Sequence, residues 1–441
     1  ELALIKLYRA TGNARYLRLA QYFVDERGRQ PHYYDEEARA RGEDPKTFWQ
    51  TSYEYCQAHQ PLREQREVVG HAVRAFYLYS GMADVAALTG DTELLAACRR
   101  LWDDATLRKM YVTGGVGPSK HNEGFTSAYD LPNETAYAET CAAIALVFFA
   151  QRMAQIEADS RYVDVLERAL YNGVLSGVSL DGTKFFYVNP LASRGTHHRQ
   201  EWFGCACCPP NLARLLASLG GYVYATAPGA VYVHLYVGSR ARVQVGGQTV
   251  ELTQETDYPW EGDGCLTVRP ATPAQFALML RVPGWCSRWT LRVNGRSVTA
   301  PVVRGYARLR RRWTAGDTVA WSFAMSVERV AAHPAVAADV GRVALQRGPL
   351  VYCLEGCDNP RVTALLLPVR SRLAARFDPR LMGGMVVVEG MAERVEAAGW
   401  QGRLYGPRSA LQRETVRFKA VPYFAWDNRK PGAMVVWMPE A

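Results

Sequence analysis

The sequence has no stretch of about 18 consecutive apolar residues, the length that a membrane-spanning helix needs. It is also poor in lysine, because 7 of its 52 basic residues are lysine and the rest are arginine. Such a bias reflects a GC-rich genome more often than a ligand, and most of the basic residues are scattered along the chain. The net charge of +9 therefore does not indicate a nucleic-acid-binding protein.

Cysteine is too sparse for a disulfide scaffold, with 10 residues in a chain of 441. Three of the ten crowd into the segment Cys205-Ala206-Cys207-Cys208. The adjacent Cys207 and Cys208 cannot bridge each other without strain. Packing in a core, a structural metal and thiol catalysis all remain open for this segment.

The rest of the composition is that of a folded protein with several domains, 48% hydrophobic and 22% charged. Apolar residues recur at helical spacing in the first half, and Thr-Gly-(Asn/Asp) links at residues 11–13 and 89–91 join successive helices. Stacked hairpins of this kind build solenoids or closed α/α toroids. We predict helices at residues 2–10, 14–25, 68–78, 94–104, 136–156, 162–172 and 211–222.

The second half changes to strand-like patterns, with alternating or β-branched runs between turn signals such as Asn294-Gly295. Short strands at this spacing are typical of antiparallel β-sandwiches, and the second half is longer than one small sandwich needs. We therefore expect a multidomain α + β protein. Its parts are a helical domain at residues 1–222, a β-sandwich at 223–329 and a second β-sandwich at 330–441, whose last strand can return to the first.

Two segments carry candidate chemistry, and the first is a glycine-rich loop at residues 111–132 that contains Glu123. Loops of this length in compact domains are usually functional. We expect Asn133 to cap the helix that follows, with Glu139 and Cys141 about two turns inside it and on different faces. A shared metal ion would then require a local distortion or an approach from the side. On spacing alone, Glu139 also fits a surface carboxylate and Cys141 a small core residue.

The second segment spans residues 202–211 and places Cys207 and Cys208 at the start of a helix, with two prolines in its first turn. A helix N-terminus stabilises a thiolate and lowers its pKa. Three cysteinates and one carboxylate make a tetrahedral zinc shell, and the soft thiolates argue against Mg²⁺ or Ca²⁺. The sequence therefore offers a candidate zinc site.

At these segments the sequence resembles the retaining β-L-arabinofuranosidases of glycoside hydrolase family 127, and the likeness covers essentially the whole chain. The resemblance implies a zinc-dependent exo-glycosidase that releases L-arabinose from β-L-arabinofuranosides. The most specific matches are a Glu-x-Cys motif and a Cys-x-Cys-Cys-Pro-Pro-Asn motif. The stretches concerned include Val69-Gly70-His71-Ala72-Val73-Arg74, Thr113-Gly114-Gly115-Val116-Gly117, Ala138-Glu139-Thr140-Cys141-Ala142 and Cys205-Ala206-Cys207-Cys208-Pro209-Pro210-Asn211.

The resemblance also implies the residue roles. Cys207 corresponds to the nucleophile, which forms a glycosyl-thioether, and Glu123 to the general acid/base. His71 corresponds to a histidine that contacts the sugar, although its position after Gly70 also fits a core or capping histidine. The zinc ligands fall on Glu139, Cys141, Cys207 and Cys208. The implied fold is an (α/α)6 toroid followed by β-sandwiches, here without the first helices of the toroid, because the family toroid has more helices than this chain supplies.

Three other functions remain as hypotheses. The same mechanism can act on a different furanoside or pectic sugar, or the chain can be a non-catalytic carbohydrate-binding protein with a structural zinc. A thiol redox role for Cys205 and Cys208 is disfavoured, because no βαβ unit lies near this Cys-x-x-Cys spacing. The expected partner is an arabinofuranose-containing glycan, without nucleic acid or membrane, and a homodimer stays open. A catalytic thiolate favours the reducing cytoplasm.

Overall fold

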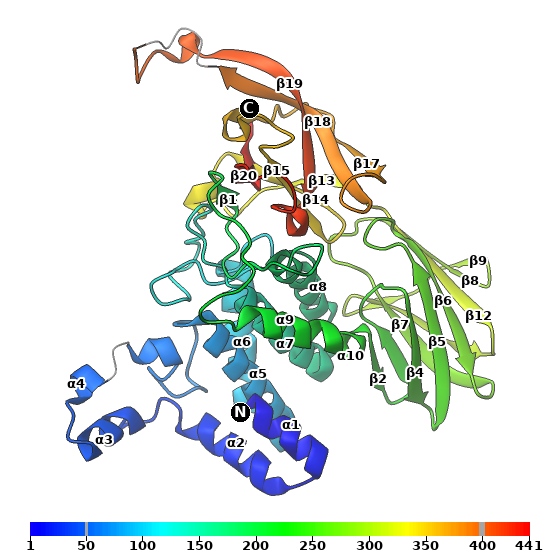
Figure 1. Ribbon diagram of the computed structural model, residues 1–441. Helices are drawn as coiled ribbons and strands as arrows, with labels where there is room; N and C mark the ends of the chain where they lie inside the picture. Colours follow the sequence, from blue (N-terminus) through cyan, green and yellow to red (C-terminus); the bar gives the residue numbers. More distant parts are fainter. Residues whose placement is uncertain (49–51, 397–401) are drawn as a thin grey trace.

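The computed structural model describes residues 1–48, 52–396 and 402–441. A helical part comes first along the chain, and two separate groups of strands follow it (Figure 1). The protein therefore mixes helices and sheets in several parts, as expected. The helices of the first part are α1 (Leu2–Thr11), α2 (Ala14–Glu26), α3 (Tyr33–Ala40), α4 (Pro45–Phe48), α5 (Ala72–Thr89), α6 (Thr92–Arg108), α7 (Thr140–Glu157), α8 (Ser160–Arg168, continued by a π-helical turn at Ala169–Val174), α9 (Cys208–Ser218) and α10 (Gly220–Val223).

Alternate long helices pack in series: α5 packs on α1, α7 on α5 and α9 on α7, while α2, α6 and α8 pack against α1, α5 and α7. The links between helices have the predicted chemistry. Gly12 and Gly90 end α1 and α5 in the left-handed conformation, where a side chain would be strained. Asn13 and Asp91 then accept backbone hydrogen bonds at the starts of α2 and α6.

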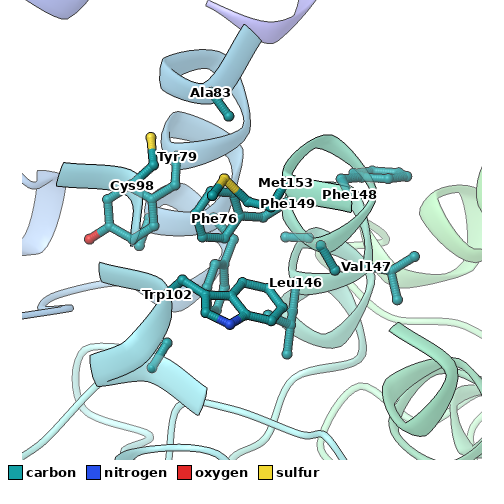
Figure 2. Close-up of a cluster of buried hydrophobic side chains, with 14 of the residues drawn as sticks. Phe76, Tyr79, Ala83, Cys98, Trp102, Leu146, Val147, Phe148, Phe149 and Met153 are labelled. Atoms are coloured by element: carbon teal, nitrogen blue, oxygen red, sulfur yellow. The ribbon is translucent and has the colours of Figure 1, made fainter. Parts of the chain in front are cut away.

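An aromatic core fixes α5 against α6 and α7 (Figure 2). Phe76 and Tyr79 of α5 lie 6.1 Å and 5.8 Å from Phe149 of α7, measured between ring centroids. Trp102 of α6 lies 5.7 Å from the same ring. Burying a large apolar side chain contributes about 1.5–3 kcal/mol, so this cluster holds the helices firmly in place. Two of them, α5 and α7, begin at residues that carry the candidate chemistry.

Two sheets follow the helical part and share one apolar core. Neighbouring strands are antiparallel as predicted, except that β3 and β7 pair in parallel. The five-stranded sheet has the order β10 (Val302–Val303), β11 (Tyr306–Trp313), β7 (Ala274–Arg281), β3 (Ala230–Val233) and β2 (Tyr224–Ala227). The six-stranded sheet has the order β4 (Ser239–Val245), β5 (Gln248–Thr256), β6 (Asp263–Pro270), β12 (Asp317–Phe323), β8 (Trp289–Val293) and β9 (Arg296–Val298).

The third sheet has ten strands and is also antiparallel. Its short first strand, β1 (Ala192–Ser193), comes from the helical part and ties this sheet to the loop that precedes Cys207. The last two strands, β20 (Met434–Val435) and β21 (Trp437–Pro439), stay in this sheet and do not return to the preceding ones. Its other strands are β13 (Val327–Val330), β14 (Arg342–Arg347), β15 (Leu350–Glu355), β16 (Leu365–Leu366), β17 (Ala374–Asp378), β18 (Met385–Glu396) and β19 (Gln412–Pro422).

The start of α7 differs from the prediction. The helix begins at Thr140 and its N-cap is Glu139, whereas Asn133 donates a hydrogen bond to Asp339 instead. The residue before the cap, Ala138, has a φ of 36°, which no helix contains. Glu139 therefore precedes the helix, so the expectation that it lies two turns inside was wrong, and it can turn towards the sulfur of a residue in the first turn.

Candidate active site

The helices α5, α7 and α9 all begin at one cavity of about 690 Å³. His71 is the N-cap of α5, Glu139 the N-cap of α7 and Cys207 the N-cap of α9. The cysteines precede Pro209 and Pro210, which occupy the first turn of α9 as predicted. All three residues line the cavity, so helix starts that are far apart in the sequence meet there.

Glu139, Cys141, Cys207 and Cys208 form a compact cluster, in which the four ligand atoms lie within 4.8 Å of one another. Glu139 Oε1 lies 3.4 Å from the sulfur of Cys207 and 3.6 Å from that of Cys208, and these two sulfurs are 3.8 Å apart. Cys207 is half-buried and faces the cavity, while the other three are buried. The structure thus brings the four predicted ligands together, and it leaves Cys205 exposed and outside the cluster.

The cluster fits a zinc ion on its own chemistry. The second carboxylate oxygen of Glu139, Oε2, is buried and has no hydrogen-bond partner among the described residues. A buried carboxylate oxygen without a partner is unfavourable, and a bound cation would satisfy it. Three thiols and one carboxylate form a donor set for tetrahedral zinc, whereas Mg²⁺ and Ca²⁺ take oxygen ligands.

The second candidate group is a histidine–carboxylate pair, in which His71 Nε2 lies 3.1 Å from Glu123 Oε2. The other ring nitrogen of His71, Nδ1, accepts a hydrogen bond from the Val73 N–H at 3.2 Å. The ring proton therefore sits on Nε2, and neutral His71 donates to Glu123. Burial lowers the pKa of His71, which keeps the ring neutral. The pair adjoins the cluster, because ligand atoms of His71, Glu123 and Glu139 also lie within 4.8 Å of one another.

Comparison with known proteins decides the family. Residues 1–221 match the β-L-arabinofuranosidase GH127 catalytic domain, residues 230–325 the GH127 middle domain and residues 327–439 the C-terminal domain of glycoside hydrolase family 127. The chain belongs to glycoside hydrolase family 127. This GH127 chain is therefore a glycoside hydrolase, which confirms the resemblance of its motifs and is incompatible with a non-catalytic binding protein.

Similar proteins of known function or structure agree with this assignment. The GH127 chain is 39% identical to a non-reducing end β-L-arabinofuranosidase of Bifidobacterium longum subsp. longum, over 99% of this chain and 70% of the relative. A solved GH127 β-L-arabinofuranosidase from Geobacillus stearothermophilus T6 is 52% identical, with a TM-score of 0.97 over 100% of this chain and 71% of that one. A second solved GH127 β-arabinofuranosidase is 41% identical, with a TM-score of 0.90 over 100% and 68% of the two chains.

Crowding of acidic groups perturbs the titration of the GH127 site. Burial, together with the charge of the neighbouring Cys207, raises the pKa of Glu139 to about 8. Hydrogen bonds from the thiols of Cys141 and Cys208 lower the pKa of Cys207. The half-buried sulfur at the cavity wall is thus the one that ionises most readily, even before a metal is considered.

Backbone contacts that require glycine hold Glu123 next to His71. Glu123 has a φ of 47°, and its carbonyl accepts a hydrogen bond from the Ala72 N–H at 3.1 Å, in the first turn of α5. The following residue, Gly124, lies so close to the Gly70 carbonyl that a Cβ would be 1.8 Å from its oxygen. The loop that carries Glu123 and the residue that precedes His71 are therefore in direct backbone contact.

Tyr187 is a site residue that the sequence did not reveal. Its hydroxyl lies 3.3 Å from the sulfur of Cys207, and its backbone carbonyl accepts a hydrogen bond from the Thr140 N–H at 3.0 Å. One residue thus joins the start of α7 to the nucleophile candidate on α9. No spacing or motif singles it out, because it lies in an irregular segment between α8 and α9.

Within the part of the chain that the structure describes, no helix is both long and apolar enough to cross a membrane.

Proposed function

We propose that this GH127 enzyme is a zinc-dependent retaining exo-glycosidase that releases L-arabinose from β-L-arabinofuranosides. One observation carries the proposal: a thiol-rich cluster and a neutral histidine–carboxylate pair share one cavity, and Glu139 lies within 4.8 Å of the ligand atoms of both. The choice of sugar rests on the relatives, which are named as β-L-arabinofuranosidases.

Cys207 is the proposed nucleophile. Zinc, when bound, keeps a coordinating thiol deprotonated at neutral pH. In the first step the sulfur of Cys207 forms a bond to the anomeric carbon while the bond from that carbon to the leaving oxygen breaks. The product of this step is a thioether between Cys207 and the sugar, as retaining hydrolysis requires of a covalent mechanism.

Glu123 is the proposed general acid/base. Its carboxyl proton passes to the leaving oxygen in the first step, and in the second its carboxylate takes a proton from the water that attacks the anomeric carbon. The carbon–sulfur bond then breaks, and the sulfur of Cys207 leaves as a thiolate. His71 donates to one oxygen of Glu123 at 3.1 Å, which turns the other oxygen towards the substrate. We also propose that the part of His71 facing the cavity contacts the sugar.

The nucleophile is tested with a matched pair of cysteine variants. Cys207→Ala should abolish turnover of an aryl β-L-arabinofuranoside, whereas Cys265→Ala should keep it, because Cys265 lies on β6, away from the cavity and the cluster. Zinc per chain, measured by plasma mass spectrometry, should be about one in the wild type and in Cys265→Ala. Full activity of Cys207→Ala would exclude the cysteine mechanism.

The acid/base is tested through the leaving group. Glu123→Ala should lose most activity towards poor leaving groups and much less towards activated aryl glycosides, which need little protonation. Equal losses on both kinds of substrate would remove Glu123 from this role. A panel of other aryl furanosides tests the alternative that the same mechanism serves a different sugar.

We further propose that the helical part belongs to an (α/α)6 toroid and that two β-sandwich domains follow, with divisions near residues 222 and 329. The serial packing of α1, α5, α7 and α9, with α2, α6 and α8 beside them, supports the first part. The shared core of the five- and six-stranded sheets supports the second. A reducing compartment, the cytoplasm, suits the proposed thiolate.

A further inference from the structure

Two arginines, Arg74 and Arg214, line the active-site cavity, and both are exposed. Neither has a carboxylate within ion-pair distance among the residues that the structure describes, although the cavity wall also holds Glu123 and Glu139. Exposed arginines in proteins are common. These two are distinguished by their place in the wall of the active-site cavity.

Aromatic rings and neutral oxygens hold both side chains. The guanidinium of Arg74 lies over the Tyr55 ring, 5.3 Å from its centroid. Arg214 lies over the Phe148 ring at 5.1 Å and donates to the Tyr77 hydroxyl and to the side-chain oxygen of Asn211. Such contacts orient a guanidinium without neutralising its charge. Each arginine therefore presents a positioned and uncompensated cation to the cavity.

Arg74 is the one that lies beside the proposed acid/base. It follows His71 by three residues at the start of α5, a spacing that places the two side chains on one face. The Tyr55 ring, over which the Arg74 guanidinium lies, also packs edge to face against the His71 ring, with 5.5 Å between the ring centroids. Arg214 instead contacts Tyr77, which lies on α5 more than one turn away from His71. Because Glu123 protonates the leaving oxygen and pairs with His71, the leaving group is the part of the substrate nearest to Arg74.

We propose that Arg74 binds a carboxylate on the leaving-group side of the substrate, so that the enzyme prefers arabinofuranosides whose aglycone is acidic, such as a uronic acid. The inference rests on the proposed function. A planar guanidinium fork matches a carboxylate with two hydrogen bonds. In the proposed first step Glu123 is the proton donor.

A second cavity next to Arg214 is positively charged. Arg214 also lines a second cavity of about 290 Å³ together with Lys6, Arg9 and Arg152. Asp84 pairs with Arg9 and Arg152, which leaves Lys6 and Arg214 without a carboxylate partner among the described residues. Burial and the nearby arginines lower the pKa of Lys6, which is a sign of net positive potential. This second cavity has no acidic residue in its lining, so it concentrates anionic ligands beside Arg214.

The test compares 3-carboxyphenyl β-L-arabinofuranoside with its methyl ester. For each enzyme form, the ratio of kcat/KM for the acid to that for the ester is measured, and ratios are then compared between forms, which cancels the difference in leaving-group reactivity. Arg74→Gln should lower the ratio about tenfold, mainly through KM, a change worth about 1.4 kcal/mol. Arg214→Gln removes the same charge from the part of the cavity wall formed by Tyr77 and Asn211, and it should lower the ratio less than about threefold.

An unchanged ratio in Arg74→Gln overturns the inference, and so does an equal fall in both variants. If the wild type hydrolyses neither compound, the proposed function has failed. Titration calorimetry of the same two compounds then still shows whether Arg74 binds the carboxylate. Tighter binding of the acid than of the ester, lost in Arg74→Gln, supports the arginine contact. Equal affinities of the wild type for the two compounds exclude it.

Discussion

Gly124 is the position where one added methyl group should most disturb the proposed acid/base. It follows Glu123 directly and forms backbone bridges with His71 and Ser119. A Cβ on Gly124 would lie 1.8 Å from the carbonyl oxygen of Gly70 and 2.5 Å from its carbonyl carbon. Both are backbone atoms, so no flexible side chain can move aside. Gly124→Ala must therefore separate the loop that carries Glu123 from the start of α5.

The size of that separation follows from the contact. Real Cβ atoms essentially never approach a heavy atom more closely than 3.0 Å, so the two segments must move apart by about 1.2 Å from the 1.8 Å contact. The hydrogen bond between His71 Nε2 and Glu123 Oε2, now 3.1 Å, would lengthen by a similar amount and break. A misplacement of about 1 Å at a reacting group costs about 100-fold in rate, so kcat/KM should fall by about that factor.

The assay uses two β-L-arabinofuranosides, one with an alkyl leaving group and one with a dinitrophenyl leaving group. The loss in Gly124→Ala should be larger for the alkyl compound, because that leaving group depends on the proton from Glu123. Gly220→Ala is the matched control, since a Cβ there meets nothing within 4 Å and its φ is outside the left-handed region. A folded Gly124→Ala enzyme with activity within threefold of the wild type on both compounds would refute this reasoning.

Three other predictions concern stability and metal. Arg281 is fully buried and pairs with Asp164 and Glu167, so Arg281→Met should lower the free energy of unfolding by about 3–5 kcal/mol. Adding Glu167→Gln should restore part of this loss. Denaturant titration measures both variants, and an unchanged free energy of unfolding in Arg281→Met would contradict the prediction. Burial lowers the pKa of His234 from 6.5 to about 4, so the stability that its neutral form provides is present above pH 6.5 and is lost as the pH falls towards 4. Thermal unfolding across this range should show up to about 3 kcal/mol of loss in the wild type and a flatter profile in His234→Gln. A strong chelator should lower the melting temperature and stop turnover, and zinc should restore both; a chelated enzyme with full activity and an unchanged melting temperature would rule out the metal.

Local signals in the sequence predicted the helical part well, because the physics behind them is local. The link at residues 11–13 contains a glycine in the left-handed conformation and an asparagine whose side chain accepts from the next helix, and both effects act within three residues. The start of α9 was predicted for the same reason, since a helix accepts prolines such as Pro209 and Pro210 without disruption only in its first turn. Helical spacing alone could not give the end points of α5, which begins at Ala72, later than predicted.

Distant contacts decide the start of α7, and the sequence near it could not have given the answer. The run Ala136–Ala138 continues the apolar helical pattern, but Asn189 donates to the carbonyl of Ala138 at 3.0 Å and to the Thr140 hydroxyl at 2.9 Å. This side chain lies about fifty positions later in the chain, and it holds the segment in a non-helical turn. Family resemblance placed Glu139 in the cluster although the spacing argued against it, and the turn removes the conflict.

The convergence of three helix starts gives a physical reason for building this site at one end of the helical part. A zinc ion and its four ligands, Glu139, Cys141, Cys207 and Cys208, would together have two negative charges in excess. The four ionised ligands carry four negative charges and the ion two positive ones. Each helix N-terminus contributes roughly half a positive charge, and α5, α7 and α9 all begin at the cavity. Their dipoles thus offset most of that excess without adding a side chain that would compete for the sulfur. The carboxylate and thiolates can then stay ionised in a largely buried position, and the one half-buried sulfur, that of Cys207, remains open to the substrate.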